Sequence, residues 1–232
     1  MSTAPKAPPA YPPLADFFAP GGALARAMND AAGRAVPYEV RDKQLAMARL
    51  VERVAEQGGV ALIEAGTGIG KTMAYLAPAV RSGKKVVVST STKTLQSQLW
   101  GKDIPLLRAA LGGDFKAALL KGRKNYLCLW RLQEEHARGL FQSRKEVGHF
   151  KKVLAWARET ATGHVSELEA LPEDAPLWDR LTVSSEECLG RKCRLYHDCF
   201  VTRARANAED ASLIVVNHHL YFADLAVRDT RF

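Results

Sequence analysis

Short apolar runs bounded by turn residues recur along the chain, and such runs are typical of buried strands. They predict four strands, over residues 60–63, 84–89, 115–120 and 213–216. Within the second run, Val86-Val87-Val88 predicts a strand that is buried on both of its faces.

Between these runs, apolar residues recur at helical spacing. The spacing predicts an amphipathic helix over residues 38–57, a second over 72–80, and a stripe over 95–107 that Pro105 interrupts. Strands that alternate with helices predict a parallel α/β sheet. In such a sheet we expect a ligand at the carboxyl ends of the strands.

The first 20 residues contain six of the eleven prolines of the chain. This composition predicts an extended leader whose first dozen residues are disordered. Leu14, Phe17 and Phe18 are too apolar to remain in water, so we expect the end of the leader to dock on the folded body.

A glycine-rich loop follows the first predicted strand and leads directly into a helix. Triphosphate binding requires backbone N–H groups that point inward, residues at positive φ, a cation for the outer phosphates and a hydroxyl for Mg²⁺. The helix adds the positive end of its dipole. We therefore predict a nucleotide site in which Lys71 holds the β- and γ-phosphates and Thr72 holds the magnesium ion. The loop reads Ala65-Gly66-Thr67-Gly68-Ile69-Gly70-Lys71-Thr72, with Ala65 where the general pattern has glycine.

Composition narrows the class of protein. The 232 residues are 47% hydrophobic and 25% charged, which suits one large globular domain or a domain with an insertion. The net charge of +8 favours a polyanionic partner such as nucleic acid. No apolar run approaches the roughly 18 residues of a membrane span, and the N-terminus lacks the pattern of a signal peptide. We therefore expect a soluble, cytoplasmic protein.

Four cysteines lie in the charge-rich stretch between the third and fourth predicted strands. Two disulfides would be unusual in a cytoplasmic nucleotide-binding protein. Buried free thiols are disfavoured as well, because the cationic segment with Arg191, Lys192 and Arg194 is poorly suited to a hydrophobic core. Structural zinc sites favour closer cysteine pairs, whereas an iron–sulfur cluster accepts wider spacings. The spacing favours a cluster but leaves zinc open, because His197 offers a further ligand. The cysteines are Cys128 and the triplet Cys188-x4-Cys193-x5-Cys199.

Four motifs together resemble the iron–sulfur helicases of superfamily 2, the XPD/DinG group, and most of all its bacterial DinG-like and YoaA-like branch. They are the phosphate loop, Lys121-Gly122-Arg123-Lys124-Asn125-Tyr126-Leu127-Cys128, the cysteine triplet, and Asn217-His218-His219. The resemblance implies a RecA-like motor domain with an inserted, mainly helical domain whose four cysteines hold a [4Fe–4S] cluster. It divides the chain into a leader (1–20), motor domain (21–120), cluster domain (121–205) and a return to the motor domain (206–232).

The resemblance also assigns residues to ATP and to DNA. It places Tyr38 and Gln44 at the adenine. The segment after the second predicted strand, with Thr90, Thr92 and Lys93, is similar to motif Ia, which grips single-stranded DNA; capping of the following helix is the structural alternative. Basic and aromatic residues beside the cysteines suit a single strand. The further DNA candidates are Arg123, Tyr126, Asn217 and His218.

Helicases of this group carry their Mg²⁺ and water-orienting carboxylates in an Asp-Glu-Ala-His motif, which we expect to lie beyond Phe232. Gln133-Glu134-Glu135-His136 follows no predicted strand and is rejected as a substitute. The resemblance thus implies the N-terminal part of an ATP-dependent 5′-to-3′ DNA helicase that is inactive alone, with single-stranded or forked DNA and replication or repair proteins as partners. A non-catalytic single-stranded-DNA-binding module and a zinc-bearing P-loop protein remain as alternatives.

Overall fold

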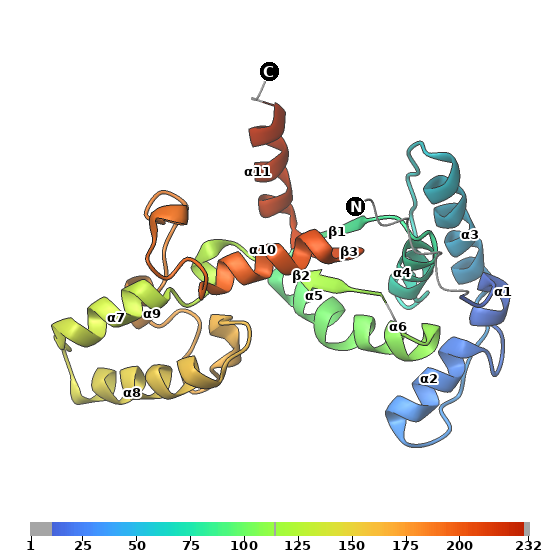
Figure 1. Cartoon of the computed structure of the whole chain (residues 1–232). Coiled ribbons are helices and arrows are strands. Elements are labelled where there is room, and N and C mark those ends of the chain that lie inside the picture. The colour runs from blue at the N-terminus through green and yellow to red at the C-terminus, as the bar shows by residue number, and fades with distance from the viewer. Residues whose placement is uncertain (1–10, 114, 230–232) are drawn as a thin grey trace, which may run out of the picture. The chain divides into compact units, whose positions relative to one another are not determined.

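The computed structural model describes residues 11–113 and 115–229 (Figure 1). The chain forms two compact units, one of residues 1–119 with 210–221 and the other of residues 120–209 with 222–232. The predicted cluster domain, 121–205, falls within the second unit. Among the described residues, no helix is both long and apolar enough to cross a membrane.

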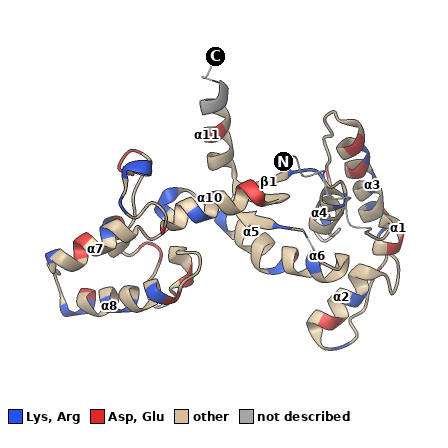
Figure 2. Ribbon diagram, in the orientation of Figure 1, with Lys and Arg blue, Asp and Glu red and all other residues tan. Residues whose placement is uncertain are grey.

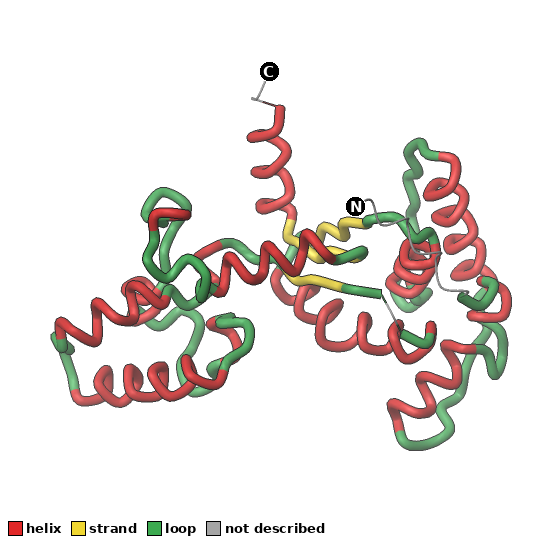
Figure 3. Tube along the Cα trace, viewed as in Figure 1, coloured by secondary structure: helices red, strands yellow, loops and turns green. Residues whose placement is uncertain are grey.

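A parallel sheet forms the centre of the first unit. Its described strands have the order β1-β3-β2, and β3 pairs in parallel with both neighbours. Figure 3 shows the strands in yellow. The first and last pairs of the β1–β3 ladder are Val86↔Leu213 and Thr90↔Asn217, so the two strands end at the same edge. This confirms the mixed α/β class with a parallel sheet. The strands are β1 (Val86–Thr90), β2 (Ala117–Leu119) and β3 (Leu213–Asn217).

Helices pack around this sheet and share one hydrophobic core with it. Phe17, Leu76, Leu107 and Val215 are fully buried in this core. α3 and α4 lie side by side (Figure 1). The helices are α1 (Leu14–Phe17), α2 (Ala23–Ala32), α3 (Asp42–Gln57), α4 (Lys71–Arg81), α5 (Lys93–Gln98), a π-helical turn (Leu99–Asp103), α6 (Ile104–Leu111) and α11 (His218–Asp229), which begins in this unit.

The strand predicted over residues 60–63 is wrong. This segment is a loop in the structure (Figure 3), and the side chains of Val60 and Leu62 are 98% and 102% exposed. A strand is stable only when a neighbour satisfies its backbone groups, and no strand of the described residues pairs with this segment. An apolar run alone therefore does not make a strand.

The expectation that Val86-Val87-Val88 is buried on both faces is also wrong. β1 lies at one side of the described sheet, and Val87 is 44% exposed. The fully buried strand is β3, in which Leu213 to Val216 are all buried. A central strand has neighbours on both sides, and the core covers both of its faces.

The end of the leader docks on the first unit, as its apolar residues predict. Leu14, Phe17 and Phe18 are buried, and Tyr11 packs against the core. The leader is not wholly extended, because Leu14–Phe17 forms the helical turn α1. The part of the disorder prediction that covers residues 1–10 lies outside the described residues.

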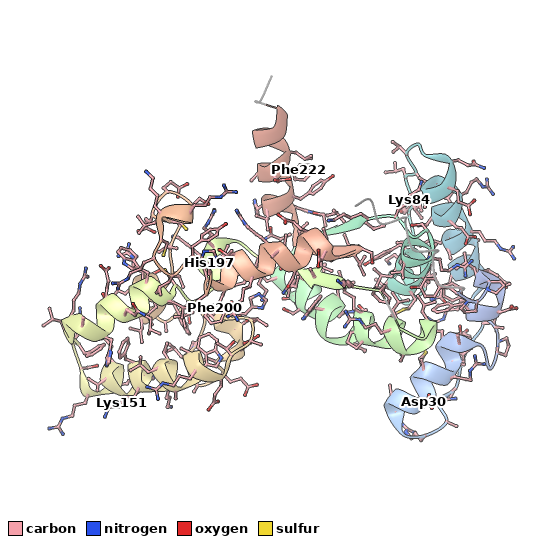
Figure 4. The ribbon with its side chains drawn as sticks, in the orientation of Figure 1. Asp30, Lys84, Lys151, His197, Phe200 and Phe222 are labelled. Atoms are coloured by element: carbon pink, nitrogen blue, oxygen red, sulfur yellow. The ribbon has the colours of Figure 1, made fainter. Side chains whose placement is uncertain are left out.

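The second unit is mainly helical and has a core of its own. Phe150, Trp178, Leu181 and Phe200 are buried in it; Phe200 is labelled in Figure 4. Gly163 has φ +68°, and a Cβ there would lie 2.3 Å from the Phe200 ring. The helices are α7 (Leu129–Arg138), α8 (Arg144–Glu159), α9 (Leu177–Leu181) and α10 (Phe200–Asp210), with 3₁₀ turns at Arg123–Asn125, Val165–Glu167 and Gly190–Lys192.

A charged network ties three of these helices together. The guanidinium of Arg180 on α9 donates to the carboxylates of Glu135 on α7 and Glu146 on α8, the latter at 2.6 Å. The Glu135 side chain is only 6% exposed, so its charge is stable there only while it is paired. Glu135 therefore has a structural role, which supports the rejection of residues 133–136 as a magnesium motif.

Replacing Arg180 with Met should destabilise the second unit by about 3 kcal/mol, because it leaves the buried Glu135 carboxylate without its main partner. Urea unfolding followed by tryptophan fluorescence measures this change, since Trp130, Trp156 and Trp178 lie in the unit. The exposed Arg158, replaced with Met, is the matched control. Equal losses in the two variants would contradict a structural role for the network.

Candidate nucleotide site and cysteine pocket

The glycine-rich loop has the backbone geometry that a phosphate loop requires. Gly68 and Gly70 have φ of +81° and +82°, a region that residues with a Cβ rarely adopt. Gly70 is the N-terminal cap of α4, so the free N–H groups and the positive dipole end of this helix adjoin the loop. Lys71 Nζ donates to the carbonyl oxygens of Ala65 at 2.9 Å and Gly66 at 2.6 Å.

Side chains from the preceding segment hold this loop by its carbonyl groups. Gln44 Nε2 donates to the Gly70 carbonyl at 2.9 Å, and the Arg41 guanidinium donates to the Gly68 carbonyl. Gln44 is only 6% exposed, so this bond is made in the interior. Tyr38 Oη donates to the Phe18 carbonyl at 3.1 Å. The structure thus gives Gln44 a loop-supporting role that the sequence did not predict.

A second set of polar groups lies where the sheet ends. A pocket of about 280 Å³ is lined by Thr72 and Tyr75 of α4, Ser89 of β1, His218 of α11 and Asp103. Ser89 Oγ and His218 Nδ1 are 2.7 Å apart. The pocket joins the last residue of the phosphate loop to the carboxyl ends of β1 and β3. Parallel pairing of these two strands brings the groups together, as the predicted location of the ligand requires.

Burial changes the acidity of two groups in this pocket. The pKa of Asp103 is raised by its burial, an effect that Lys102 and a hydrogen bond from Gln98 oppose. Burial likewise raises the pKa of Tyr75, the Thr72 side chain lowers it, and the negative charge of Asp103 raises it. Neither residue was a candidate from the sequence. The available signal was the three-residue spacing that places Tyr75 one helical turn beyond Thr72.

Several DNA candidates of the first unit have structural partners. Thr92 Oγ1 accepts from the backbone N–H of Leu95 at 3.2 Å, which confirms that this segment caps the following helix. Thr90 is buried, with 8% of its surface exposed, whereas Lys93 is exposed. Asn217 Oδ1 accepts from the N–H of Leu220 at 2.8 Å at the start of α11. These bonds fix the side chains of Thr92 and Asn217 beyond the ends of their strands.

All four cysteines line a single pocket in the second unit. The pocket has a volume of about 490 Å³, and its four thiols are free and half-buried. This arrangement argues against the disulfide alternative. No three described His, Cys, Asp or Glu side chains lie close enough together to hold a single metal ion. Four thiols around one cavity are a donor set that both zinc sites and iron–sulfur clusters use.

One thiol occupies the start of a helix. Cys128 is the N-terminal cap of α7, and its side chain makes no capping hydrogen bond, although the backbone N–H groups of Arg131 and Trp130 influence its acidity. Burial raises the pKa of Cys128, these two N–H groups lower it, and the nearby Cys199 and Cys193 raise it. The helix end therefore partly offsets the cost of a buried thiolate, the form that binds metal.

Basic residues surround the thiols in the same pocket. Arg123, Arg191 and Arg205 contribute to its lining, and α10 carries only arginines, Arg203 and Arg205, as basic residues (Figure 2). Nearby cations stabilise the thiolate form of cysteine and attract other anionic groups. Arg123 also donates to Ser185 Oγ at 3.0 Å. His197, the further ligand considered for zinc, is labelled in Figure 4 and is not among the residues that line the pocket.

Tyr126 does not have the location expected of a DNA-stacking residue. Its ring is 1% exposed and packs against His164, with ring centroids 4.7 Å apart, and its hydroxyl accepts from the Lys121 N–H. Burial and the nearby Lys121 lower the pKa of His164 to about 4, so this ring is neutral at pH 7. Since Tyr126 belongs to the core of the second unit, its ring is not available to a base. The basic and aromatic pattern could not distinguish a core tyrosine from a surface one.

The fold and the site define the class of protein. One unit is an α/β unit in which a glycine-rich loop leads into a helix beside the carboxyl edge of a parallel sheet. The other unit of the chain is helical and contains four free cysteines. No family model matches the chain. The chain is similar in sequence to several curated proteins. The chain is 43% identical over 219 residues to the "ATP-dependent DNA helicase YoaA" of Haemophilus influenzae and 41% identical over the same length to that of Escherichia coli.

More distant relatives carry a second name. The chain is 36% identical over 206 residues to the "ATP-dependent helicase DinG" of Mycobacterium tuberculosis and 36% identical over 193 residues to the "3'-5' exonuclease DinG" of Bacillus subtilis. The YoaA alignments cover 94% of this chain but 33% of each relative. The chain is related to these DinG and YoaA helicases and spans about one third of the length of the YoaA relatives.

Replacing Gly70 with Ala should destabilise the first unit by about 3 kcal/mol and replacing Gly68 by about 1 kcal/mol, as judged by thermal unfolding. Both positions require positive φ. A Cβ at Gly70 would also lie 2.2 Å from Gln44 Nε2, whereas one at Gly68 meets nothing within 4 Å. Gly70→Ala therefore loses the Gln44 bond in addition. A Gly68 variant as unstable as the Gly70 variant would contradict this account of the loop.

Proposed function

We propose that this chain binds ATP and Mg²⁺ at the loop over residues 65–72. The observation that carries the proposal is the pair of positive-φ glycines directly before α4, followed by Lys71 and Thr72 at the start of that helix. Lys71 would exchange its two loop carbonyls for the β- and γ-phosphates, and Thr72 would hold Mg²⁺. Tyr38 and Gln44 would adjoin the adenine, with Gln44 also fixing the loop.

We further propose that the longer protein is an ATP-dependent 5′-to-3′ DNA helicase that acts in the cytoplasm on single-stranded or forked DNA during repair. The names of the YoaA relatives support the helicase activity, and the net charge of +8 suits the polyanionic substrate. Exposed polar groups at the carboxyl edge would contact the DNA backbone without reading bases. At this edge we propose the exposed Lys93 and His218 and the half-buried Asn217, with Thr90 and Thr92 placing their segment. In the second unit we propose Arg123 as a separate DNA contact.

We propose that Cys128, Cys188, Cys193 and Cys199 hold a [4Fe–4S] cluster. Four free thiols around one cavity, a helix start at Cys128 and arginines beside it fit the donors and the negative charge of such a group. When bound, the cluster would cross-link α7 to the loop before α10 and so stabilise the second unit. A zinc ion remains the competing occupant and is separated by metal analysis.

Residues 1–232 alone should bind ATP but hydrolyse none, because no Asp-Glu-Ala-His motif is present in them. Binding is measured by competition with a fluorescent ATP analogue, and Lys71→Ala should lower the affinity at least about 10-fold. The exposed Lys151, labelled in Figure 4, replaced with Ala is the matched control. ATP turnover that DNA stimulates and Lys71→Ala abolishes would contradict the proposed inactivity.

Anaerobically purified chain should contain about four iron atoms and four acid-labile sulfides per molecule, with the broad visible absorption of an iron–sulfur cluster. Removing the iron with a chelator should lower the midpoint of thermal unfolding, and Cys188→Ser should reduce the iron content. Lys192→Ser, at an exposed position in the same segment, is the control and should leave it unchanged. One zinc per chain and no sulfide would show that zinc is the native occupant.

A further inference from the structure

The hydroxyl of Thr72 needs a hydrogen-bond acceptor for its proton when its oxygen binds Mg²⁺, and this acceptor must come from outside the phosphate loop. A hydroxyl has one proton to donate and oxygen lone pairs that accept hydrogen bonds or bind a metal. When the oxygen of Thr72 faces Mg²⁺, the proton must point to an acceptor on the other side. An acceptor that fixes this orientation favours metal binding, because the hydroxyl then loses less rotational freedom when the ion arrives.

Tyr75 is placed to be that acceptor. It lies one turn after Thr72 on α4, so the two side chains are neighbours on one face of the helix, and both residues line the pocket at the carboxyl edge of the sheet. A tyrosine hydroxyl that accepts a proton from Thr72 still has its own proton to donate. Tyr75 is half-buried, and an acceptor of the protein that lies within reach of its hydroxyl can take that proton.

Asp103 offers the complementary group. The residue is 8% exposed and lines the same pocket, and its Oδ2 is buried with no hydrogen-bond partner among the described residues. A side-chain hydrogen bond from Gln98 serves the Asp103 carboxyl group. An unpaired buried carboxylate oxygen is costly, and the nearby Tyr75 hydroxyl can satisfy it directly or through one water in the pocket.

We infer that Tyr75 and Asp103 form a hydrogen-bond relay that orients the Thr72 hydroxyl for Mg²⁺. Thr72 donates to Tyr75, and Tyr75 donates to Asp103, which leaves the lone pairs of Thr72 directed at the metal. Tyr75 and Asp103 are thus positioning residues that touch neither nucleotide nor metal. The inference rests on the proposed nucleotide site and deepens it by naming groups that set its affinity for magnesium.

The test compares ATP affinity in Mg²⁺ with ATP affinity in EDTA for residues 1–232. Tyr75→Phe removes one hydroxyl and should lower the affinity in Mg²⁺ about fivefold while leaving the affinity in EDTA unchanged. Asp103→Asn should have a smaller effect of the same kind. In a Thr72→Ala background, Tyr75→Phe should cost nothing further, because the group that it orients is gone. Tyr196→Phe and the exposed Asp210→Asn serve as matched controls, and circular dichroism monitors the fold of every variant.

The outcomes separate this inference from the proposed function. Equal affinity of Tyr75→Phe and the parent chain in Mg²⁺, an equal loss in EDTA, or an additive loss in the Thr72→Ala background each overturns the relay while leaving the nucleotide site intact. Nucleotide binding that Lys71→Ala does not weaken, or a parent chain that binds no ATP, overturns the proposed function and this inference with it. If Asp103→Asn fails to fold, Tyr75→Phe decides the question alone.

Discussion

The parallel pairing of β1 with β3 is the constraint on which the first unit depends. The two strands are more than a hundred residues apart in the chain, yet five residue pairs, from Val86↔Leu213 to Thr90↔Asn217, bring their carboxyl ends together. Closing so long a connection costs chain entropy, which the burial of the whole apolar length of β3 offsets. Ser89 can meet His218, and both can share a pocket with Thr72, only because this ladder forms in register.

The phosphate loop shows how a binding segment depends on groups outside its motif. Gly68 and Gly70 supply the curvature, but their carbonyl groups are held by Arg41 and Gln44 from the start of the preceding helix. A loop that must approach a ligand closely has few side chains with which to stabilise itself. Its support therefore comes from neighbouring residues, and Gln44 serves the loop backbone whatever it contributes to the nucleotide.

In the second unit, the hydrophobic core positions the four cysteines. Its core places Cys128 at the start of α7 and gathers the three other cysteines around one cavity lined by arginines. The Glu135–Arg180–Glu146 network joins the helices that frame this core. The buried Glu135 carboxylate is costly unless Arg180 pairs with it, so the network favours the arrangement of helices that keeps this pair together. The thiols thus lie around one cavity as a result of folding.

The sequence by itself determined the local chemistry: the glycine loop and its Lys71-Thr72 end, the four thiols, the kinship with DinG/YoaA-like helicases, the burial of Phe17, and a Ser/Thr cap on the helix after the second predicted strand. These features depend on residue type and short-range spacing, and both can be read directly from the amino-acid sequence. The tertiary structure decided which apolar runs become strands, since the 60–63 run has no partner and Val87 lies in a side strand. It also decided that Tyr126 is a core residue and that Tyr75 and Asp103 share a pocket with Thr72. Burial and pairing depend on neighbours distant in sequence, and only the folded chain brings those neighbours together.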